Sequence, residues 1–397
     1  MTGLIDFDTA LARLAATAHP LPVETVPLAA AAGRWLSAPV IARCAAPRAA
    51  VSAMDGYAVN DAATRPGMAL RVIGEARPGA PFSGAVSAGE TVRIFTGGPL
   101  PVGTDRVIVQ EQATRSGDEV SFAPGYGPAR YVRAAGSDFA AGDRLLERGT
   151  RLTPLAMVAA AAADLAVLEV HRRPRVAILG TGDELALPGT ALERPLAVPD
   201  SVTHAIAALV EADGGEVVAR VTGGDDLAAL TASAGDLLAA ADIVVVTGGA
   251  SVGAYDFARA AFAAQGYAPV FARVAIKPGK PVWFGTVGDR LVLGLPGNPT
   301  SAMVTATLFL RPLLARLQGA AAGDLLRWRH LPLAAPLAAT DERETFARAL
   351  WDEAGLVPLV NQDSGAQAML ARADWLIRCP AGSPARGAGE MVRALAL

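Results

Sequence analysis

The feature that most constrains the fold is a regular alternation of apolar strands and amphipathic helices between residues 173 and 316. Strand-like runs such as VAILG, EVVARV and IVVVTGG alternate with predicted helices over 201–213, 225–241 and 256–264. Strands that are apolar throughout are typical of a parallel sheet with helices on both faces. A hairpin over VWFGTVGDRLVLGL and a long apolar helix over 299–317 follow. We therefore predict a doubly wound, mostly parallel α/β domain over residues 173–320.

The segments on either side of this domain have a different character. The first 40 residues are predicted to be helical, with a helix starting at Asp6 and Asp8 and a second, alanine-rich run ending near Trp35. Thr153 and Pro154 form an N-cap and first-turn pair that opens another alanine-rich helix. Short strand-like pieces separated by Gly, Pro and Asp turns are typical of small β domains. The predicted regions are helical over 1–42 plus 138–172, an inserted β domain over 43–137, the α/β domain over 173–320 and a C-terminal β domain over 326–397.

Composition excludes several classes of protein. The net charge is −3, which gives no global basic field for nucleic acid. The two cysteines, Cys44 and Cys379, support neither a disulfide framework nor a thiolate metal cluster, so a reducing, cytoplasmic compartment is the simpler expectation. No apolar run approaches the roughly 20 residues of a membrane span. The four histidines show no metal-ligand spacing. We expect a soluble globular protein with no nucleic-acid or membrane partner.

Polar residues follow three predicted parallel strands, at the sheet edge where doubly wound domains bind ligands. These residues lie in three loops: Gly180-Thr181-Gly182-Asp183-Glu184, then Thr222-Gly223-Gly224-Asp225-Asp226, then Thr247-Gly248-Gly249-Ala250-Ser251-Val252-Gly253 with Asp256 beyond. Paired glycines let backbone N–H groups approach an oxyanion near a helix N-terminus. Two alternatives remain: glycine serves only to bend the chain, and Asp225 and Asp256 serve only as helix caps. The local pattern indicates a solvated surface carboxylate for Asp226.

Only two of the 35 basic residues are lysines, Lys277 and Lys280, and both lie in one IKPGKP stretch around Pro278-Gly279. Either this is drift in an arginine-rich background, or both positions need a compact, flexible ammonium group to hold phosphate. The next loop, Gly294-Leu295-Pro296-Gly297-Asn298-Pro299, opens a long helix whose free N–H groups offer another anion site. Its alternative role is a rigid turn. Lysines beside carboxylates suit a phosphate-bearing ligand with a bridging Mg²⁺ ion.

Two motifs lie outside this domain. Met54-Asp55-Gly56-Tyr57-Ala58-Val59 has the composition of a turn, and Phe95-Thr96-Gly97-Gly98 is a glycine turn after a strand. Taken alone, each is more often structural than functional.

Seven motifs in this order resemble the MoeA/gephyrin-E family, the molybdopterin molybdenumtransferases. They are MDGYAV, FTGGPLP, GSDFAAGD, GTGDEL, VVVTGGASVG with Asp256, AIKPGKP and GLPGNPTSA. The resemblance covers about residues 50–315. It implies an α/β multidomain fold with a helical dimerisation region, an inserted small β domain, a doubly wound molybdopterin-binding domain and a C-terminal β barrel. It also implies a homodimer whose site joins the α/β domain of one protomer to the β domain of the other.

The resemblance further implies a reaction, partners and site residues. Adenylylated molybdopterin and molybdate would be the substrates, Mg²⁺ the cofactor and AMP a product; a molybdopterin adenylyltransferase and downstream molybdoenzyme chaperones are plausible partners. The implied catalytic residues are Asp55, Thr96, Asp138, Glu184, Asp225, Asp256, Lys277 and Lys280, of which Glu184, Asp225 and Asp256 would hold the metal. The implied cofactor-binding residues are Thr181, Gly182, Asp183, Gly248, Gly249, Ser251, Gly253, Pro278, Gly279, Pro296, Gly297, Asn298, Arg348 and Ser364.

Two positions depart from the family pattern. Pro199-Asp200-Ser201-Val202 stands where the family commonly has D-S-N, and Ala254 stands where an acid follows the SVG turn. These departures leave two alternatives to the transferase: a non-catalytic paralogue that binds the cofactor, and a molybdopterin adenylyltransferase.

Overall fold

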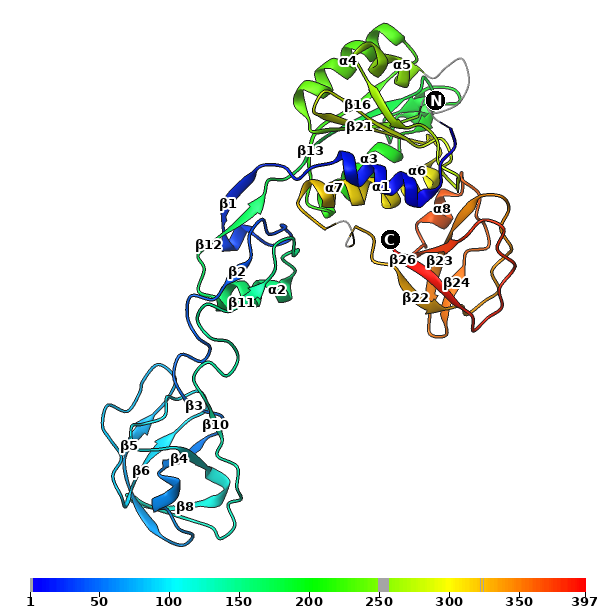
Figure 1. The fold of residues 1–397 in the computed structure, drawn as a ribbon. Helices are drawn as coiled ribbons and strands as arrows, with labels where there is room; N and C mark the ends of the chain where they lie inside the picture. Colours follow the sequence, from blue (N-terminus) through cyan, green and yellow to red (C-terminus); the bar gives the residue numbers. More distant parts are fainter. Residues whose placement is uncertain (1–2, 249–256, 322, 324) are drawn as a thin grey trace. The chain divides into compact units, whose positions relative to one another are not determined.

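A computed structural model of the chain describes residues 3–248, 257–321, 323 and 325–397. The chain divides into two compact units, here called the main unit and the inserted unit (Figure 1). The main unit comprises residues 1–38, 148–153 and 169–397, and the inserted unit comprises residues 39–147 and 154–168. No helix among the described residues has the length and apolar character needed to span a bilayer.

The centre of the main unit is a six-stranded sheet in the order β16-β13-β17-β21-β20-β18. Its strands are β13 (Arg175–Thr181), β16 (Glu216–Gly223), β17 (Ile243–Thr247), β18 (Ala268–Phe271), β20 (Trp283–Val287) and β21 (Arg290–Leu295). The pairs β13–β16, β13–β17 and β17–β21 are parallel, whereas β20 pairs antiparallel with β21 and β18 with β20. The prediction of a mostly parallel sheet is therefore confirmed, with an antiparallel edge formed by the predicted hairpin.

Helices cover both faces of this sheet (Figure 1). One face packs α1 (Phe7–Thr17), α3 (Val202–Ala212), α6 (Pro299–Thr305) and α7 (Arg311–Leu317), and the other packs α4 (Leu227–Ala240) and α5 (Phe257–Ala264). Strand β17 shows how the sequence produces this arrangement. Ile243 and Val245 join the core on the first face, and Val244 and Val246 join the core on the second. Successive side chains point to opposite faces, so a strand buried on both sides must be apolar throughout.

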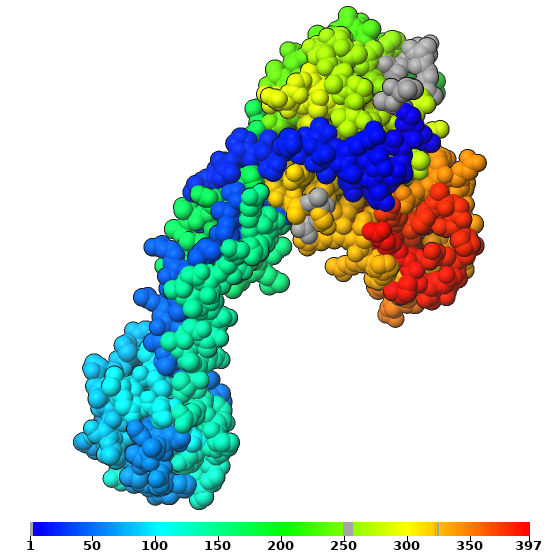
Figure 2. Space-filling view, viewed as in Figure 1, coloured from blue at the N-terminus to red at the C-terminus, as the bar shows by residue number. Residues whose placement is uncertain are grey.

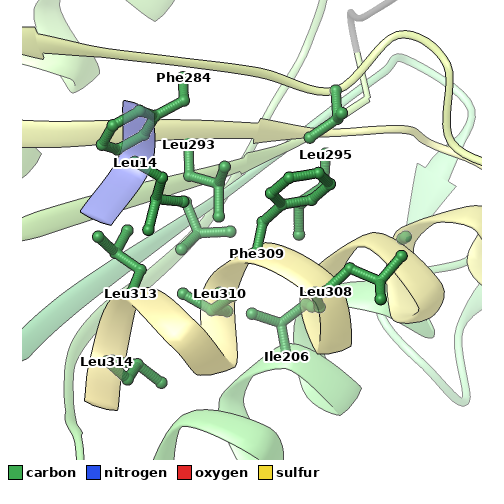
Figure 3. Close-up of a cluster of buried hydrophobic side chains, with 14 of the residues drawn as sticks. Leu14, Ile206, Phe284, Leu293, Leu295, Leu308, Phe309, Leu310, Leu313 and Leu314 are labelled. Atoms are coloured by element: carbon green, nitrogen blue, oxygen red, sulfur yellow. The ribbon is translucent and has the colours of Figure 1, made fainter. Parts of the chain in front are cut away.

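The predicted helix over 299–317 is continuous but contains a π-helical segment, Ala306–Leu310, between α6 and α7. All five residues of this segment are buried. Leu308, Phe309 and Leu310 pack with Leu14 and Leu293 in the core of the first face (Figure 3). The burial of each such side chain contributes on the order of 1.5–3 kcal/mol, so this helix anchors the loop that precedes it.

The prediction of helix throughout the first 40 residues is wrong in its second half. After α1 the chain forms β1 (Val23–Pro27), which pairs with β12 (Val167–His171), and then a single 3₁₀ turn, Leu28–Ala30. The alanine-rich run follows β1 and forms only this 3₁₀ turn, whereas the β-branched Val23, Thr25 and Val26 suit a strand that pairs with residues distant in sequence. Helix α1 begins at the predicted Asp6 cap and packs Phe7, Ala10 and Leu14 into the core of the α/β domain. In the space-filling view the dark blue N-terminal residues lie against the surface of the main unit (Figure 2).

The C-terminal residues of the main unit form a second six-stranded sheet, in the order β19-β23-β25-β26-β22 with β24 paired to β23. Its elements are β19 (Ile276–Lys277), β22 (Arg329–Pro332), β23 (Glu344–Asp352), β24 (Gly355–Pro358), β25 (Trp375–Cys379) and β26 (Met391–Ala396), with the short α8 (Gln367–Leu370). Strand β19 belongs to the α/β segment in sequence but pairs in parallel with β23. The predicted C-terminal β region is confirmed, and its closure into a barrel stays a prediction.

The inserted unit contains a six-stranded sheet in the order β7-β4-β6-β5-β9-β8. Its strands are β4 (Gly56–Val59), β5 (Ala69–Ala76), β6 (Glu90–Ile94), β7 (Arg106–Val109), β8 (Ala113–Ser116) and β9 (Glu119–Phe122). The smaller pairs are β3 (Val51–Ser52) with β10 (Val132–Arg133) and β2 (Val40–Ile41) with β11 (Arg144–Leu146), and 3₁₀ turns occur at Asp61–Ala63 and Gln110–Gln112. The predicted small β domain is confirmed.

Two details of this unit differ from the expectations. The motif at residues 54–59, interpreted as a turn, contains the buried strand β4. This strand lies between β6 and β7, and its backbone hydrogen-bonds to both of them. The predicted helix after Thr153 is present as α2 (Pro154–Ala162), but residues 154–168 group with the inserted unit rather than with α1. The four-region division of the chain stays a prediction.

Candidate functional site at the carboxyl ends of the strands

A cavity of about 650 Å³ lies where β13, β17 and β21 end, as expected for a doubly wound sheet. Its lining combines the strand-end loops with the first turns of α3, α6 and α8. The residues are Thr181, Gly182, Glu184, Leu185, Val198, Pro199, Asp200, Ser201, Val202, Asp225, Thr247, Gly248, Pro281, Pro296, Gly297, Asn298, Pro299 and Gln367. The structure thus brings together predicted residues from four separate loops.

Three carboxylates converge beside this cavity. Asp183 Oδ1 accepts a hydrogen bond of 3.0 Å from the backbone N–H of Asp225, which joins the loops after β13 and β16. Gly224 permits this contact because a Cβ at that position would lie 2.6 Å from Asp183 Oδ1. Partial burial raises the pKa of Asp225, and the negative charges of Asp183 and Glu184 raise it further. The cluster therefore carries negative charge that a cation would stabilise.

The role expected for Asp226 is corrected by the structure. Asp226, not Asp225, is the N-cap of α4, and its Oδ1 accepts from the backbone N–H groups of Ala228 and Ala229 at 2.8 and 3.1 Å. An N-cap residue has extended backbone and directly precedes the first helical residue. The first helical residue here is Leu227, so the cap is Asp226. Asp225 is therefore not engaged in capping.

The carboxylates fit Mg²⁺ by chemistry, since Mg²⁺ is usually bound through one or two carboxylates together with water and substrate phosphate. Of the predicted metal ligands, Glu184 and Asp225 line the cavity. The third, Asp256, lies outside the described residues, as do Gly249, Ser251 and Gly253. Within the described residues, no three His, Cys, Asp or Glu side chains form a ready-made metal site.

The two lysines lie on a turn beside the cavity, and Pro281, directly after Lys280, lines it. Gly279 has a φ of +108°, and a Cβ there would lie 2.2 Å from Thr305 Cγ2, so the turn requires glycine. Lys277 is the last residue of β19, and its Nζ lies 3.3 Å from Asp341 Oδ2 of the C-terminal sheet. Lys280 forms no ion pair with any residue that the structure describes. The turn thus connects the α/β domain to the C-terminal sheet.

The loop before α6 is also tied to the C-terminal sheet. Asn298 Nδ2 donates to Ser364 Oγ at 3.0 Å, and Asn298, Pro296 and Gly297 line the cavity. Arg348 is fully buried, and its guanidinium donates to Thr300 Oγ1 and to the backbone carbonyls of Asn361 and Asp363. It therefore holds the loop that carries Ser364, and the cofactor-binding role that the resemblance implies for Arg348 stays a prediction.

Asp200 and Gln367 are among the lining residues that were not in the predicted site set. Asp200 is buried, and its carboxylate accepts from the backbone N–H and the hydroxyl of Thr203. Its position directly after a short strand and before a helix was a usable signal. Gln367, the first residue of α8, accepts from Ser201 Oγ at 3.1 Å. No sequence signal indicated Gln367, because α8 belongs to the C-terminal region and is distant in sequence from the strand-end loops.

In the inserted unit, the structure brings Asp55 and Thr96 together. Asp55 Oδ1 accepts hydrogen bonds from the backbone N–H and the hydroxyl of Thr96 at 2.7 and 2.8 Å, and these bonds lower the pKa of Asp55. The guanidinium of Arg93 lies over the rings of Tyr57 and Phe95 and adds positive charge nearby. Asp138 is exposed, and its backbone N–H donates to Ala46 O. The functional roles of these three predicted residues stay predictions.

The fold and the cavity define a multidomain α/β protein with a ligand site at the strand ends of a doubly wound domain. Family models match residues 5–163 (MoeA N-terminal region, domains I and II), 177–316 (probable molybdopterin binding domain) and 330–397 (MoeA C-terminal region, domain IV).

Curated relatives have names that agree with these family models. The chain is 36% identical over 345 residues to molybdopterin molybdenumtransferase 2 of Mycobacterium tuberculosis, covering 84% of each chain. It is 36% identical over 303 residues to the molybdopterin molybdenumtransferase of Haemophilus influenzae, covering 76% of this chain and 74% of the relative. A crystal structure of a molybdopterin biosynthesis MoeA protein from Pyrococcus horikoshii matches with a TM-score of 0.79, 27% identity and 99% coverage of both chains. The chain belongs to the MoeA family of molybdopterin molybdenumtransferases.

Proposed function

We propose that this chain inserts molybdenum from molybdate into adenylylated molybdopterin, with release of AMP and dependence on Mg²⁺. The observation that carries this proposal is the carboxylate cluster of Asp183, Glu184 and Asp225 beside a cavity lined by glycine turns. A negatively charged cluster at the strand ends suits a phosphorylated ligand only with a bridging cation. The names of the curated relatives agree with this assignment.

The residues of the chain divide the work in this proposal. Backbone N–H groups of the loops at Gly248 and Gly297 hold phosphate oxygens, and the Lys277 and Lys280 turn adds positive charge. Glu184 and Asp225 hold Mg²⁺ together with Asp256. When bound, Mg²⁺ neutralises charge that develops on the departing AMP phosphate.

The proposed reaction combines metal insertion with hydrolysis of the phosphoanhydride. The two dithiolene thiols bind the metal as one oxide of molybdate leaves with their protons as water. Water cleaves the phosphoanhydride, and AMP departs. Preorganised backbone amides and lysines around the anhydride stabilise the charge that builds up on its oxygens.

Purified chain incubated with adenylylated molybdopterin, Mg²⁺ and molybdate should release AMP and yield a metallated cofactor that activates an apo-molybdoenzyme. No turnover under conditions where a curated relative is active would contradict the proposal. Tight ligand binding without AMP release would identify the non-catalytic paralogue instead. Consumption of ATP with unadenylylated molybdopterin would identify the adenylyltransferase.

The second part of the proposal is a homodimer in which helix α2 forms part of the interface. Its sequence, PLAMVAAAA, contains no charged residue, and Leu155 and Val158 are 84% and 67% exposed. An exposed helix face of this kind is typical of an association surface. The expected result is a dimer by light scattering for the wild type and a monomer for Leu155→Glu/Val158→Glu. Leu192→Glu, a similarly exposed leucine in the main unit, is the control that should leave the mass unchanged.

A further inference from the structure

The C-terminal sheet contains a second cavity, of about 370 Å³, that the proposed reaction does not use. It is lined by His330, Leu337, Glu344, Arg378, Cys379, Pro380, Arg386, Met391, Val392 and Arg393. Three arginines and one histidine thus face a single carboxylate. This volume lies within the usual range for small-molecule sites, about 300–1,000 Å³.

The basic side chains are not scattered on this surface but aligned across three neighbouring strands. Arg378 of β25 lies directly opposite Arg393 of β26, and Arg393 lies directly opposite His330 of β22. Directly opposite residues project from the same face of a sheet, and like charges in such pairs destabilise it. The fold therefore concentrates positive charge at this cavity.

The available carboxylates compensate only one of the arginines. The Nε of Arg378 donates to Glu344 Oε1, and its Nη2 donates to Asp8 Oδ2 of α1 at 2.7 Å. Arg386 donates from Nη1 to the backbone carbonyl of Met391 at 3.2 Å. Arg393 lies over the ring of Trp328, with its Cζ 5.3 Å from the centroid. Among the residues that the structure describes, neither Arg386 nor Arg393 forms an ion pair.

The remaining groups in the cavity do not compete with an anion. Burial raises the pKa of the Cys379 thiol to about 11, so it is neutral at physiological pH. Leu337, Met391 and Val392 give the cavity apolar walls, against which guanidinium groups form stronger hydrogen bonds than they do in bulk water.

From this arrangement we propose that the cavity binds a tetrahedral oxyanion, either free or as the phosphoryl group of a small molecule. Arg386 and Arg393 are its principal ligands, with Arg378 held in place by its two carboxylates. Guanidinium forks match the spacing of oxygens on phosphate-type groups and bind them in bidentate fashion. This site is separate from the strand-end cavity, and the inference does not depend on the proposed transferase reaction.

The test is calorimetric titration of the full-length chain with inorganic phosphate, molybdate and AMP, with adenosine as the uncharged control, at constant ionic strength. The variant is Arg386→Gln/Arg393→Gln. The matched control is Arg329→Gln, since Arg329 neighbours His330 on β22 and therefore projects from the opposite face. The double variant should weaken one oxyanion-binding event at least about tenfold, or about 1.4 kcal/mol, while Arg329→Gln binds like the wild type.

The outcomes separate the possible sources of the ligand. Equal affinity for phosphate and AMP supports a free oxyanion, and tighter binding of AMP supports a phosphorylated small molecule. A binding event that the double variant retains belongs to the strand-end cavity. If the double variant binds every anion as the wild type does, the proposal is overturned.

A variant that keeps the positive charge is the control for loss of binding through misfolding. Arg386→Lys/Arg393→Lys should unfold at the same temperature as the wild type and retain binding at an intermediate affinity, because lysine keeps the charge but loses the bidentate fork. Loss of binding in the Gln variant together with a wild-type melting temperature supports the site. Wild-type affinity in the Gln variant refutes it even if the Lys variant is destabilised.

Discussion

Asp183 accepts a hydrogen bond from the backbone N–H of Asp225, so two acidic loops that end neighbouring strands are held within 3.0 Å of each other. The contact fixes the Asp225 backbone, while its carboxylate stays beside two other negative charges. Asp226, one residue later, satisfies the N-terminal N–H groups of α4. Two adjacent aspartates therefore have separate roles, which mutation can resolve.

Replacing Asp225 with asparagine should stabilise the metal-free protein and abolish metal insertion. The pKa of Asp225 is raised in the folded state, so its ionised form costs stability above that pKa, and this cost disappears as pH falls below the ordinary value of 3.8. The melting temperature of Asp225→Asn should exceed that of the wild type at pH 7 and match it near pH 3. Added Mg²⁺ should raise the melting temperature of the wild type only. An unchanged melting temperature at pH 7 would show that the cluster carries no repulsion.

Replacing Asp226 with alanine should have the opposite pattern. Loss of the cap leaves the N–H groups of Ala228 and Ala229 without their carboxylate acceptor, which costs roughly 0.5–2 kcal/mol. We expect lower stability in urea unfolding but retention of most of the transferase activity. Loss of activity without loss of stability would assign Asp226 a role in the site.

Changing Thr96 to valine should raise the pKa of Asp55. The variant keeps the backbone donor but removes the hydroxyl donor, and both lower this pKa in the wild type. The stabilisation that these bonds provide is present above the ordinary pKa of 3.8 and is lost as pH falls through the lowered value. Carboxyl carbon shifts followed by NMR during an acid titration measure the change. Identical titration curves for variant and wild type would exclude the hydroxyl contact.

Truncation of Arg348 to alanine should disorder the loop that carries Ser364. The side chain is fully buried and donates to Thr300 and to two loop carbonyls, and leaving a buried acceptor such as Thr300 Oγ1 unpaired costs about 1–3 kcal/mol. Hydrogen exchange should increase over residues 361–365, with a parallel loss of activity. Arg372→Ala, at an exposed position, is the control. Unaltered exchange in this loop would show that Arg348 does not order it.

Placing alanine at Gly279 should distort the lysine turn. The positive φ of +108° and a Cβ 2.2 Å from Thr305 Cγ2 are both incompatible with a side chain, at a cost on the order of 1–3 kcal/mol. Ligand affinity should fall together with stability, because Lys277 and Lys280 lie on the same turn. Gly288→Ala, where the φ is also positive but no atom lies within 4 Å of the added Cβ, should cost less and leave affinity unchanged. Equal effects of the two variants would argue against a role for the turn in ligand binding.

Much of the fold follows from local sequence. The uninterrupted apolar run of β17, the Asp6 cap of α1 and the Gly214 end of α3 each depend on residues within one element or one turn. The order of these elements also places the strand-end loops at one edge of the sheet, so Thr181, Glu184, Asp225 and Asn298 were predictable as neighbours. Periodicity and capping act over a few residues, and sequence reports them directly.

Tertiary structure decided the rest, because those contacts join residues far apart in the chain. Lys277 contacts Asp341, Asn298 contacts Ser364 and Ser201 contacts Gln367, and β19 pairs with β23 of the C-terminal sheet. Strand pairing likewise placed residues 23–27 in β1, within a segment expected to be helical, and placed a turn-like motif in β4. The sequence by itself determined which loops lie at the carboxyl ends of the strands. The pairing of distant strands determined which side chains those loops place together, since that pairing depends on burial and hydrogen bonding across the whole molecule.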